Sequence, residues 1–498
     1  MSARKFAYTS LAQVVGKFLG FFISSFSIVI LTSKLGTQGL GNYTTITAFL
    51  AFFVNLADFG VTTVMIREIA QNQERREALT ADFLGLRILL GTAVLALAPI
   101  SAYFIPQYHG EIAHGIIIMA LAQLLLLINQ AFVSVLQSVV KLDQAVFAEI
   151  VNRLVTLLLM FWGAKHFFTV NTFLNYVLWI TVVGSLVNIT IAYFLARKNW
   201  KIGANFNFTR SKQLIILVLP MGIISFLSII HFRSDTILLS LLKSQHDVGV
   251  YGYAYKVGEI LLSIPTMLVG VIFPQLSLLY KKDLAEFRVF AQKAFSLMLV
   301  FTVPFISGIF VMAPYLTTLL SRQSFPDGLS AAYALKVLCI AMFCWYFGSL
   351  FQNILLVGNN YKGLMRNITI AVVLNLALNL IFIPLFSYRG AAWTTVTSEI
   401  VMLILTMHYV GKSTGFWATL DGFFPVVASS LALCGAVYLI QTHITSPLAV
   451  YAQEGRLHQL GDLSLMALTG SVAFVAIMLL WGKRSPLFSF AQLLLKSS

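Results

Sequence analysis

Charged residues are scarce in this chain of 498 residues, since Asp, Glu, Lys and Arg together supply 10% of it. A soluble protein carries about 25%, so the composition excludes an ordinary water-soluble domain. Cysteine is nearly absent too, and Cys339, Cys344 and Cys434 lie in apolar stretches without the spacing of metal ligands, which favours a role in packing. The chain also lacks a Walker motif, which excludes ATP as the direct source of energy.

Long apolar stretches dominate what is present. Hydrophobic residues make up 59% of the chain. They gather in stretches of about 20 to 28 residues, each long enough to cross a hydrocarbon core of about 30 Å as a helix. The sequence therefore predicts an all-α, polytopic membrane protein with about 14 transmembrane helices. The predicted spans are 8–33, 43–69, 80–104, 112–138, 145–166, 172–196, 213–241, 250–279, 287–312, 331–357, 363–386, 390–411, 419–441 and 464–482.

Basic residues predict the orientation of these spans. With the N-terminus in the cytoplasm, twenty Lys and Arg fall in cytoplasmic segments and six fall in outer ones, in keeping with the positive-inside rule. The six are Lys34, Lys165, Lys243, Arg322, Arg389 and Arg456. We therefore expect a multi-pass protein of the cell's inner (plasma) membrane with both termini cytoplasmic. The net charge of +15 then reflects topology and contact with membrane lipids, and no nucleic-acid partner is expected.

The chain divides into two related halves and an appendage. A shift of 208 residues superposes Gly41-x-Tyr43 on Gly249-x-Tyr251. An even number of spans per half predicts parallel repeats related by a pseudo-twofold axis along the membrane normal, a common transporter plan with the site between the halves. The predicted domains are a first six-helix lobe (1–205), a second six-helix lobe (206–412), and two additional helices with a cytoplasmic tail (413–498).

A few ionised residues lie inside the predicted spans instead of between them. Burying such a group in lipid costs several kcal/mol unless a partner or a wet cavity receives it, so each is a candidate functional residue. Cations suit an anionic substrate, because Arg offers planar bidentate donors and Lys a point charge. The cations expected to line a substrate cavity are Lys17, Arg87, Arg153, Arg233 and Lys256. The acids that can couple transport to Na+ or H+ are Asp58, Asp235, Glu259 and Glu399.

Simpler explanations stay open for the charges that have near neighbours in sequence. Glu149 and Arg153 are spaced i,i+4, so the pair can neutralise itself on one helix face, and Lys256 and Glu259 at i,i+3 can do the same. Arg233 and Asp235 are two residues apart, point in different directions and need other partners.

Three further positions are open in the same way. Asp58 lies in mid-span beside Gly60, where it can bind an ion or a proton, or cap a kink. Arg87 can snorkel towards the cytoplasm instead of facing a cavity. The spacing Gly16-x-x-x-Gly20 indicates close packing of two helices.

Several short motifs carry a family resemblance over spans one to twelve. In the first half they are Leu35-Gly36-x-x-Gly39-Leu40-Gly41-x-Tyr43, Asp58-Phe59-Gly60 and Ile66-Arg67-Glu68-Ile69-Ala70. In the second half they are Val248-Gly249-Val250-Tyr251, Ala254-Tyr255-Lys256-x-x-Glu259, Leu374-Asn375-x-x-Leu378-Asn379-x-x-Phe382-Ile383-Pro384 and Gly390-Ala391-Ala392. With these motifs the chain resembles the polysaccharide-biosynthesis (Wzx-like) flippases of the multidrug/oligosaccharidyl-lipid/polysaccharide (MOP) exporter superfamily.

The resemblance implies a V-shaped bundle of two lobes that moves polyprenyl-pyrophosphate-linked oligosaccharides from the cytoplasmic to the outer leaflet by alternating access. It implies a role in the biosynthesis of O-antigen, capsule or exopolysaccharide. The implied partners are the lipid-linked oligosaccharide, membrane lipids and proteins of polysaccharide assembly. The related peptidoglycan lipid flippases share the fold, but their arginine-rich first-helix pattern is not found here, where span one carries only Lys17.

Two other functions compete with this interpretation. A drug or metabolite antiporter of the same superfamily, coupled to an ion gradient, would favour buried acids, whereas five deep basic residues argue for an anionic substrate. A polytopic polysaccharide polymerase or ligase would need large outer loops with catalytic residues, and the predicted outer loops are mostly short. We therefore expect a transporter and no enzyme, without catalytic residues, metal site or cofactor beyond a coupling ion, Na+ or H+.

Overall fold

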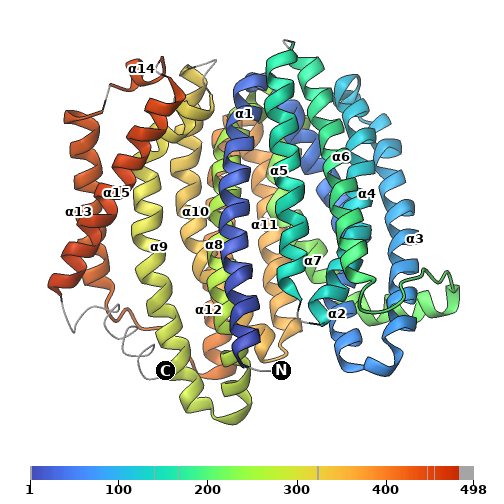
Figure 1. Ribbon diagram of the computed structural model, residues 1–498. Helices are drawn as coiled ribbons and strands as arrows, with labels where there is room; N and C mark the ends of the chain where they lie inside the picture. The colour runs from blue at the N-terminus through green and yellow to red at the C-terminus, as the bar shows by residue number, and fades with distance from the viewer. Residues whose placement is uncertain are drawn as a thin grey trace. The chain divides into compact units, whose positions relative to one another are not determined.

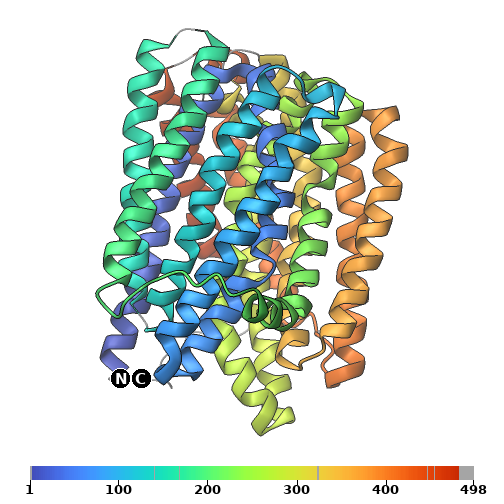
Figure 2. The same cartoon turned by 90° about the vertical axis from the view of Figure 1, so that its right-hand side faces the viewer.

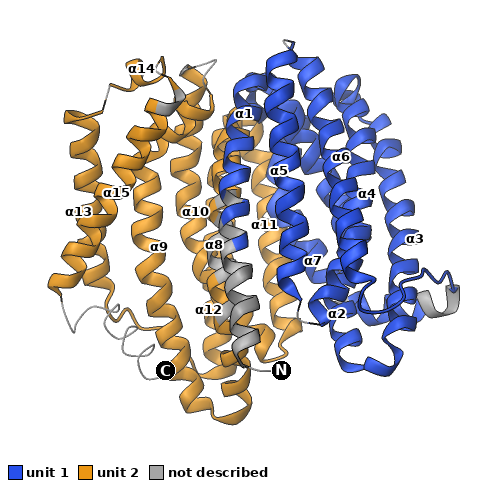
Figure 3. Ribbon diagram, in the orientation of Figure 1, with its two compact units in different colours: residues 1–249 blue, residues 250–498 orange. Residues whose placement is uncertain are grey.

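The computed structural model describes residues 3–481 apart from 140, 168, 322–324, 446 and 454, and these described residues form helices with short connections and no strand. The chain divides into two compact units, residues 1–249 and 250–498 (Figure 3). Most helices of each unit run side by side along its long dimension (Figure 1). The predicted all-α fold is confirmed.

The helices follow one another with few other elements between them. The first unit holds α1 (Ala3–Asp58), α2 (Val61–Gln71), α3 (Arg76–Tyr103), α4 (Glu111–Ser138), α5 (Leu142–His166), α6 (Val170–Ala196) and α7 (Phe208–Leu242). Beginning at the end of the first unit, the chain continues with α8 (Gln245–Lys282), α9 (Leu284–Leu320), α10 (Phe325–Val357), α11 (Tyr361–Phe386), α12 (Tyr388–Thr414), α13 (Phe423–His443), α14 (Leu448–Tyr451) and α15 (Arg456–Leu480). Two short 3-10 helices, Gln73–Arg75 and Pro106–Tyr108, flank α3.

Twelve helical stretches of the described residues are long and apolar enough to cross a membrane, so the chain is a multi-pass membrane protein and the predicted count of fourteen is approximate. The first two predicted spans are joined in one stretch, Phe22–Gln71. The eighth lies in α8, some of whose side chains fall outside the described part, and it is not among the twelve.

Two changes of direction interrupt the joined stretch. Gly36 has φ 61° and ψ −172° inside α1, so the helix is kinked there. The second comes between α1 and α2, where Phe59 (φ 39°) and Gly60 (φ 78°) both adopt left-handed conformations. A glycine takes such a φ without a steric penalty, whereas Phe59 is strained. The chain is therefore kinked beside Gly60, and the start of α2 has no side-chain cap, so the role of Asp58 stays a prediction.

A reciprocal crossing joins the two segments that the 208-residue shift superposes. A Cβ added at Gly41 would lie 1.8 Å from the carbonyl oxygen of Gln245, and one added at Gly249 would lie 1.9 Å from the carbonyl oxygen of Thr37. Gln245 and Gly249 are the counterparts of Thr37 and Gly41 under that shift. The Oγ1 of Thr45 donates a hydrogen bond to Oε1 of Gln245 at 2.7 Å. The sequence echo thus corresponds to a symmetric backbone contact.

The segment between α6 and α7 lies across the start of α3 (Figure 2). The indole Nε1 of Trp200 donates to Thr80 Oγ1 at 3.2 Å. Asn205 donates from its backbone to the carbonyl of Ala81 at 2.9 Å and from Nδ2 to Asp82 at 2.6 Å. These bonds fix the chain just before it enters α7.

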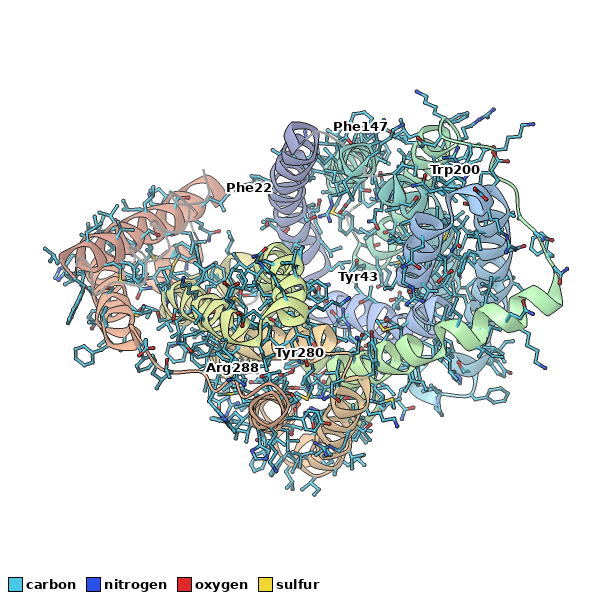
Figure 4. All side chains as sticks on the ribbon, turned by 90° about the horizontal axis from the view of Figure 1, so that it is seen from below. Phe22, Tyr43, Phe147, Trp200, Tyr280 and Arg288 are labelled. Carbon is cyan, nitrogen blue, oxygen red and sulfur yellow. The ribbon has the colours of Figure 1, made fainter. Side chains whose placement is uncertain are left out.

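The segment between α12 and α13 is attached to α9 in a comparable way. Nε of Arg288 donates to the carbonyl of Thr414 at 2.8 Å. The amide of Gln292 exchanges two hydrogen bonds, of 2.8 and 2.9 Å, with the backbone of Thr419. Arg288 stands 208 residues after Thr80, and Figure 4 labels it and Trp200 in their two units. Each set of six predicted spans therefore ends with a connection tied to the third span of that set.

The first compact unit includes α7, which packs against α1, α2 and α3. The lobe boundary predicted at 205–206 divides the chain by its internal sequence repeat, whereas the compact units divide it by packing. That lobe boundary stays a prediction.

Candidate functional site

Arg87 lies at the centre of a buried polar network in the first unit. Its side chain is fully buried, and its Nη2 donates to Asp58 Oδ1 at 2.6 Å and to Thr62 Oγ1 at 2.7 Å. Its Nη1 donates to the carbonyl of Leu127 on α4 at 3.1 Å. The guanidinium therefore faces protein groups in this conformation. Its predicted contact with substrate stays a prediction.

Asp58 and Thr62 lie on opposite flanks of the α1–α2 break. The Thr62 hydroxyl donates to Asp58 Oδ1 at 2.6 Å while it accepts from Arg87. Since Arg87 belongs to α3 and also bonds α4, one guanidinium ties both flanks of the break to two neighbouring helices. The Asp58 side chain is 28% exposed, whereas that of Arg87 is fully buried.

Arg153 on α5 has 35% of its side chain exposed, more than Arg87 or Lys256. Its Nε and Nη2 donate to Glu149 Oε1 at 3.0 and 2.5 Å, which confirms the predicted i,i+4 pair. On its other edge, Nη1 donates to the carbonyl of Gly20 at 3.0 Å and to the hydroxyl of Ser24, both on α1. A single guanidinium therefore carries a carboxylate on one edge and is attached to a neighbouring helix on the other.

The two glycines of the first predicted span allow this approach. A Cβ added at Gly16 would lie 2.1 Å from the Val146 side chain on α5, and one at Gly20 would lie 3.3 Å from Nε of Arg153. Close packing of α1 on another helix through Gly16-x-x-x-Gly20 is confirmed. Lys17 lies between them in α1, but its side chain falls outside the described part of the chain.

Arg233 and Asp235 on α7 occupy different surroundings, as their two-residue spacing predicts. The guanidinium of Arg233 lies over the ring of Phe232, 5.2 Å from its centroid. Asp235 is buried, and its Oδ1 accepts from the backbone and the hydroxyl of Thr236 at 2.6 and 3.2 Å.

The remaining candidates belong to α8 and α12. Lys256 Nζ donates to Glu259 Oε2 at 2.9 Å, which confirms the predicted i,i+3 pair, and the two side chains are 13% and 26% exposed. Glu399 is buried on α12.

Ser398, next to Glu399, belongs to a chain of buried hydrogen bonds with Asn375 and Asn379 that the site prediction missed. Asn379 donates to Asn375 at 2.8 Å, and Asn375 donates to the Ser398 hydroxyl at 3.0 Å. All three side chains are buried. The signal was present in the i,i+4 spacing of two Asn in an apolar run, since buried amides need partners.

Comparisons with known proteins were made for the whole chain. The family described as "Polysaccharide biosynthesis protein" matches residues 2–279, more than half of the chain. A relative from Haloferax volcanii, named "Probable low-salt glycan biosynthesis flippase Agl15", is 22% identical over 446 residues, 88% of this chain and 90% of the relative.

Two solved structures share the fold at low sequence identity. The Lipid II flippase MurJ in an inward closed conformation has a TM-score of 0.73 and 15% identity, over 95% of this chain and 99% of MurJ. An inward-facing multidrug resistance MATE family transporter of the MOP superfamily has a TM-score of 0.67 and 14% identity, over 81% of this chain and 98% of the transporter. These likenesses establish the fold, and the family match establishes the lineage: the chain belongs to the polysaccharide biosynthesis protein family.

Proposed function

We propose that this protein is a flippase that moves polyprenyl-pyrophosphate-linked oligosaccharides from the cytoplasmic to the outer leaflet by alternating access. The product would feed the assembly of a polysaccharide such as O-antigen, capsule or exopolysaccharide, with the assembly proteins as partners. The observation that carries the proposal is the Arg153 guanidinium, which is one-third exposed on a membrane-spanning helix and attached to a second helix. Membership of the family and the glycan flippase named among its relatives support it.

A pyrophosphate headgroup needs cations that replace its hydration while it crosses a low-dielectric path. Arg153 and Arg233 from the first unit, and Lys256 on α8, are the cations for this role, together with Lys17. The isoprenoid tail can stay in the bilayer, so only the pyrophosphate and sugars need a polar path. An ion-coupled drug antiporter would carry a cation, which these side chains repel.

The first test is transport in proteoliposomes. We expect Arg153→Ala and Arg233→Ala each to lower the rate of translocation of a fluorescent polyprenyl-pyrophosphate glycan at least about tenfold. Such a change corresponds to an activation free energy about 1.4 kcal/mol higher. Lys replacements should recover part of the rate, because they keep the charge and lose the bidentate geometry. Arg67→Ala is the control, since Arg67 is exposed and pairs with its sequence neighbour Glu68. Wild-type rates in both Ala variants would exclude the anion path.

The drive is proposed to be an ion gradient that buried carboxylates sense. The candidate sensors are Asp58, Asp235, Glu259 and Glu399, of which Asp235 and Glu399 have buried side chains. In the same proteoliposomes, an imposed Na+ or H+ gradient should accelerate wild-type transport, and Asp235→Asn or Glu399→Gln should remove the acceleration. Equal rates with and without either gradient would leave substrate mass action as the drive.

The second test concerns orientation in the inner (plasma) membrane, with both termini cytoplasmic. In a chain from which the three cysteines have been removed, single cysteines at Gly203 and Val450 should react with a membrane-impermeant maleimide from opposite sides. Gly203 has open space around it and Val450 is 50% exposed, so neither replacement should disturb packing. Position 450 should label from outside intact cells. Labelling of both from one side would contradict the topology.

A further inference from the structure

The two edges of the Arg153 guanidinium differ in how firmly they are occupied. Guanidinium has five N–H donors. The Nη1 edge meets a backbone carbonyl, that of Gly20, and the Ser24 hydroxyl, both on the neighbouring helix α1. The carbonyl cannot rotate away, so this edge holds the guanidinium in place. Gly20 permits the approach, since a Cβ there would lie 3.3 and 3.4 Å from Nε and Cδ of Arg153.

On the opposite edge, Nε and Nη2 both donate to one oxygen of Glu149. A carboxylate or a phosphate can bind this edge with two parallel hydrogen bonds, one to each of two oxygens. The Glu149 side chain is 49% exposed, more than the 35% of its partner. The Glu149 side chain is thus less enclosed than the bonds to α1, and exposed ion pairs contribute only about 0.2–1 kcal/mol to stability. The bidentate edge is therefore occupied by an exchangeable anion.

We propose that Glu149 is the resident counter-ion of an anion site on Arg153, and that the pyrophosphate of the substrate displaces it. Two non-bridging oxygens of the pyrophosphate would take the N–H groups of Nε and Nη2, while Nη1 keeps its bonds to α1. The displaced carboxylate stays close enough to repel the bound anion, and its return to Arg153 helps to expel the substrate. Glu149 is thus a positioning residue that sets affinity and release at the proposed site, and this inference rests on the proposed function.

This arrangement predicts an unusual direction of effect. Glu149→Gln keeps an oxygen that accepts from Arg153 but removes the competing charge, so the anion should bind more tightly. If the pair only stabilised the fold, Glu149→Gln would weaken anion binding, because loss of either partner would lower the stability of the folded protein and its binding together. Binding and turnover should therefore separate: Glu149→Gln lowers KM and also lowers kcat, because release is slower.

The experiment is a double-mutant cycle with inorganic pyrophosphate as the probe, measured by calorimetry on the purified full chain. Glu149→Gln should tighten pyrophosphate binding about fivefold, equivalent to about 1 kcal/mol, and the gain should vanish in Glu149→Gln/Arg153→Ala. Ser24→Ala should weaken binding by loosening the fixed edge. The matched control is Glu68→Gln, which removes the carboxylate of another ion pair of the first unit, Arg67–Glu68.

Unchanged or weaker binding in Glu149→Gln overturns the proposal, and so does equal tightening in the absence of Arg153. The proposal is also overturned if neither the wild-type protein nor Glu149→Gln binds pyrophosphate. Melting temperatures of all variants show whether a loss comes from unfolding, and Arg153→Gln, which also removes the charge, replaces Arg153→Ala in the cycle if the latter does not fold. Because binding is measured without membranes, it can fail while glycan translocation in proteoliposomes succeeds, so this inference and the flippase function are tested separately.

Discussion

Replacing Arg87 with Ala should be among the most damaging single changes in the first unit. The substitution removes the cation beside the Asp58 carboxylate and the side-chain donor to the Leu127 carbonyl, and it opens a cavity at a fully buried position. Removing one partner of a buried ion pair costs about 3–5 kcal/mol. At a few degrees for each kcal/mol, the apparent melting temperature in detergent should fall by about 10 °C. Fluorescence-detected size exclusion after heating measures it.

A double replacement distinguishes the contribution of the two charges from that of the volume of the two side chains. Arg87→Met with Asp58→Leu removes both charges and keeps the volume, so most of the lost stability should return, because buried ion pairs are often replaceable by apolar residues. The stability of Arg87→Lys should lie between those of the parent and Arg87→Ala. A single ammonium cannot bond the Leu127 carbonyl and the Asp58 carboxylate at once, as two nitrogens of the planar guanidinium do. Arg67→Ala should change little. A single Arg87→Ala variant as stable as that control would show that the network contributes nothing.

Alanine at Gly41 or Gly249 should prevent the chain from reaching the described fold. The added Cβ would lie 1.8 or 1.9 Å from a backbone carbonyl, and a backbone cannot rotate aside as a side chain can. The two helical segments would have to separate, and overpacking of this kind costs typically 1–3 kcal/mol or more. We expect a large loss of monodisperse protein and of melting temperature in each variant.

Gly435→Ala and Gly461→Ala are the matched controls. Both glycines lie within helices and have open space where the Cβ would go. Alanine in a helix is favoured over glycine by about 1 kcal/mol, so these variants should be as stable as the parent or slightly more. If Gly41→Ala and Gly249→Ala behave like these controls, the close crossing does not exist in the folded protein.

Contacts within one helix were predictable from the sequence, and contacts between helices were not. Glu149 with Arg153 and Lys256 with Glu259 follow from the helical period, which brings residues three and four apart onto one face. Arg87 meets Asp58 across 29 positions, and Arg153 reaches Gly20 across 133, because tertiary packing of different helices brings them together. A periodic pattern identifies the buried face of a helix and does not identify its neighbour.

The helix ends show the same division. Apolar length predicted nearly every span, but a boundary predicted at residues 34–42 is a kink at Gly36 inside one long helix. A break in the middle of the next predicted span follows from two left-handed residues, Phe59 and Gly60. Gly60 signalled that break, while the left-handed Phe59 had no signal, because its conformation is maintained by surrounding contacts against its own preference.

The crossing of Thr37–Gly41 with Gln245–Gly249 has the form of an isologous interface, in which each partner offers the same patch to the other. In a homodimer every substitution in such a patch occurs twice, so the two sides cannot diverge. Here both sides are encoded separately in one polypeptide. Thr45 already differs from its counterpart, Tyr253, 208 residues later, and its hydroxyl donates a hydrogen bond to Gln245. A covalent pseudo-dimer can therefore keep the symmetric backbone contact while each side acquires its own charges.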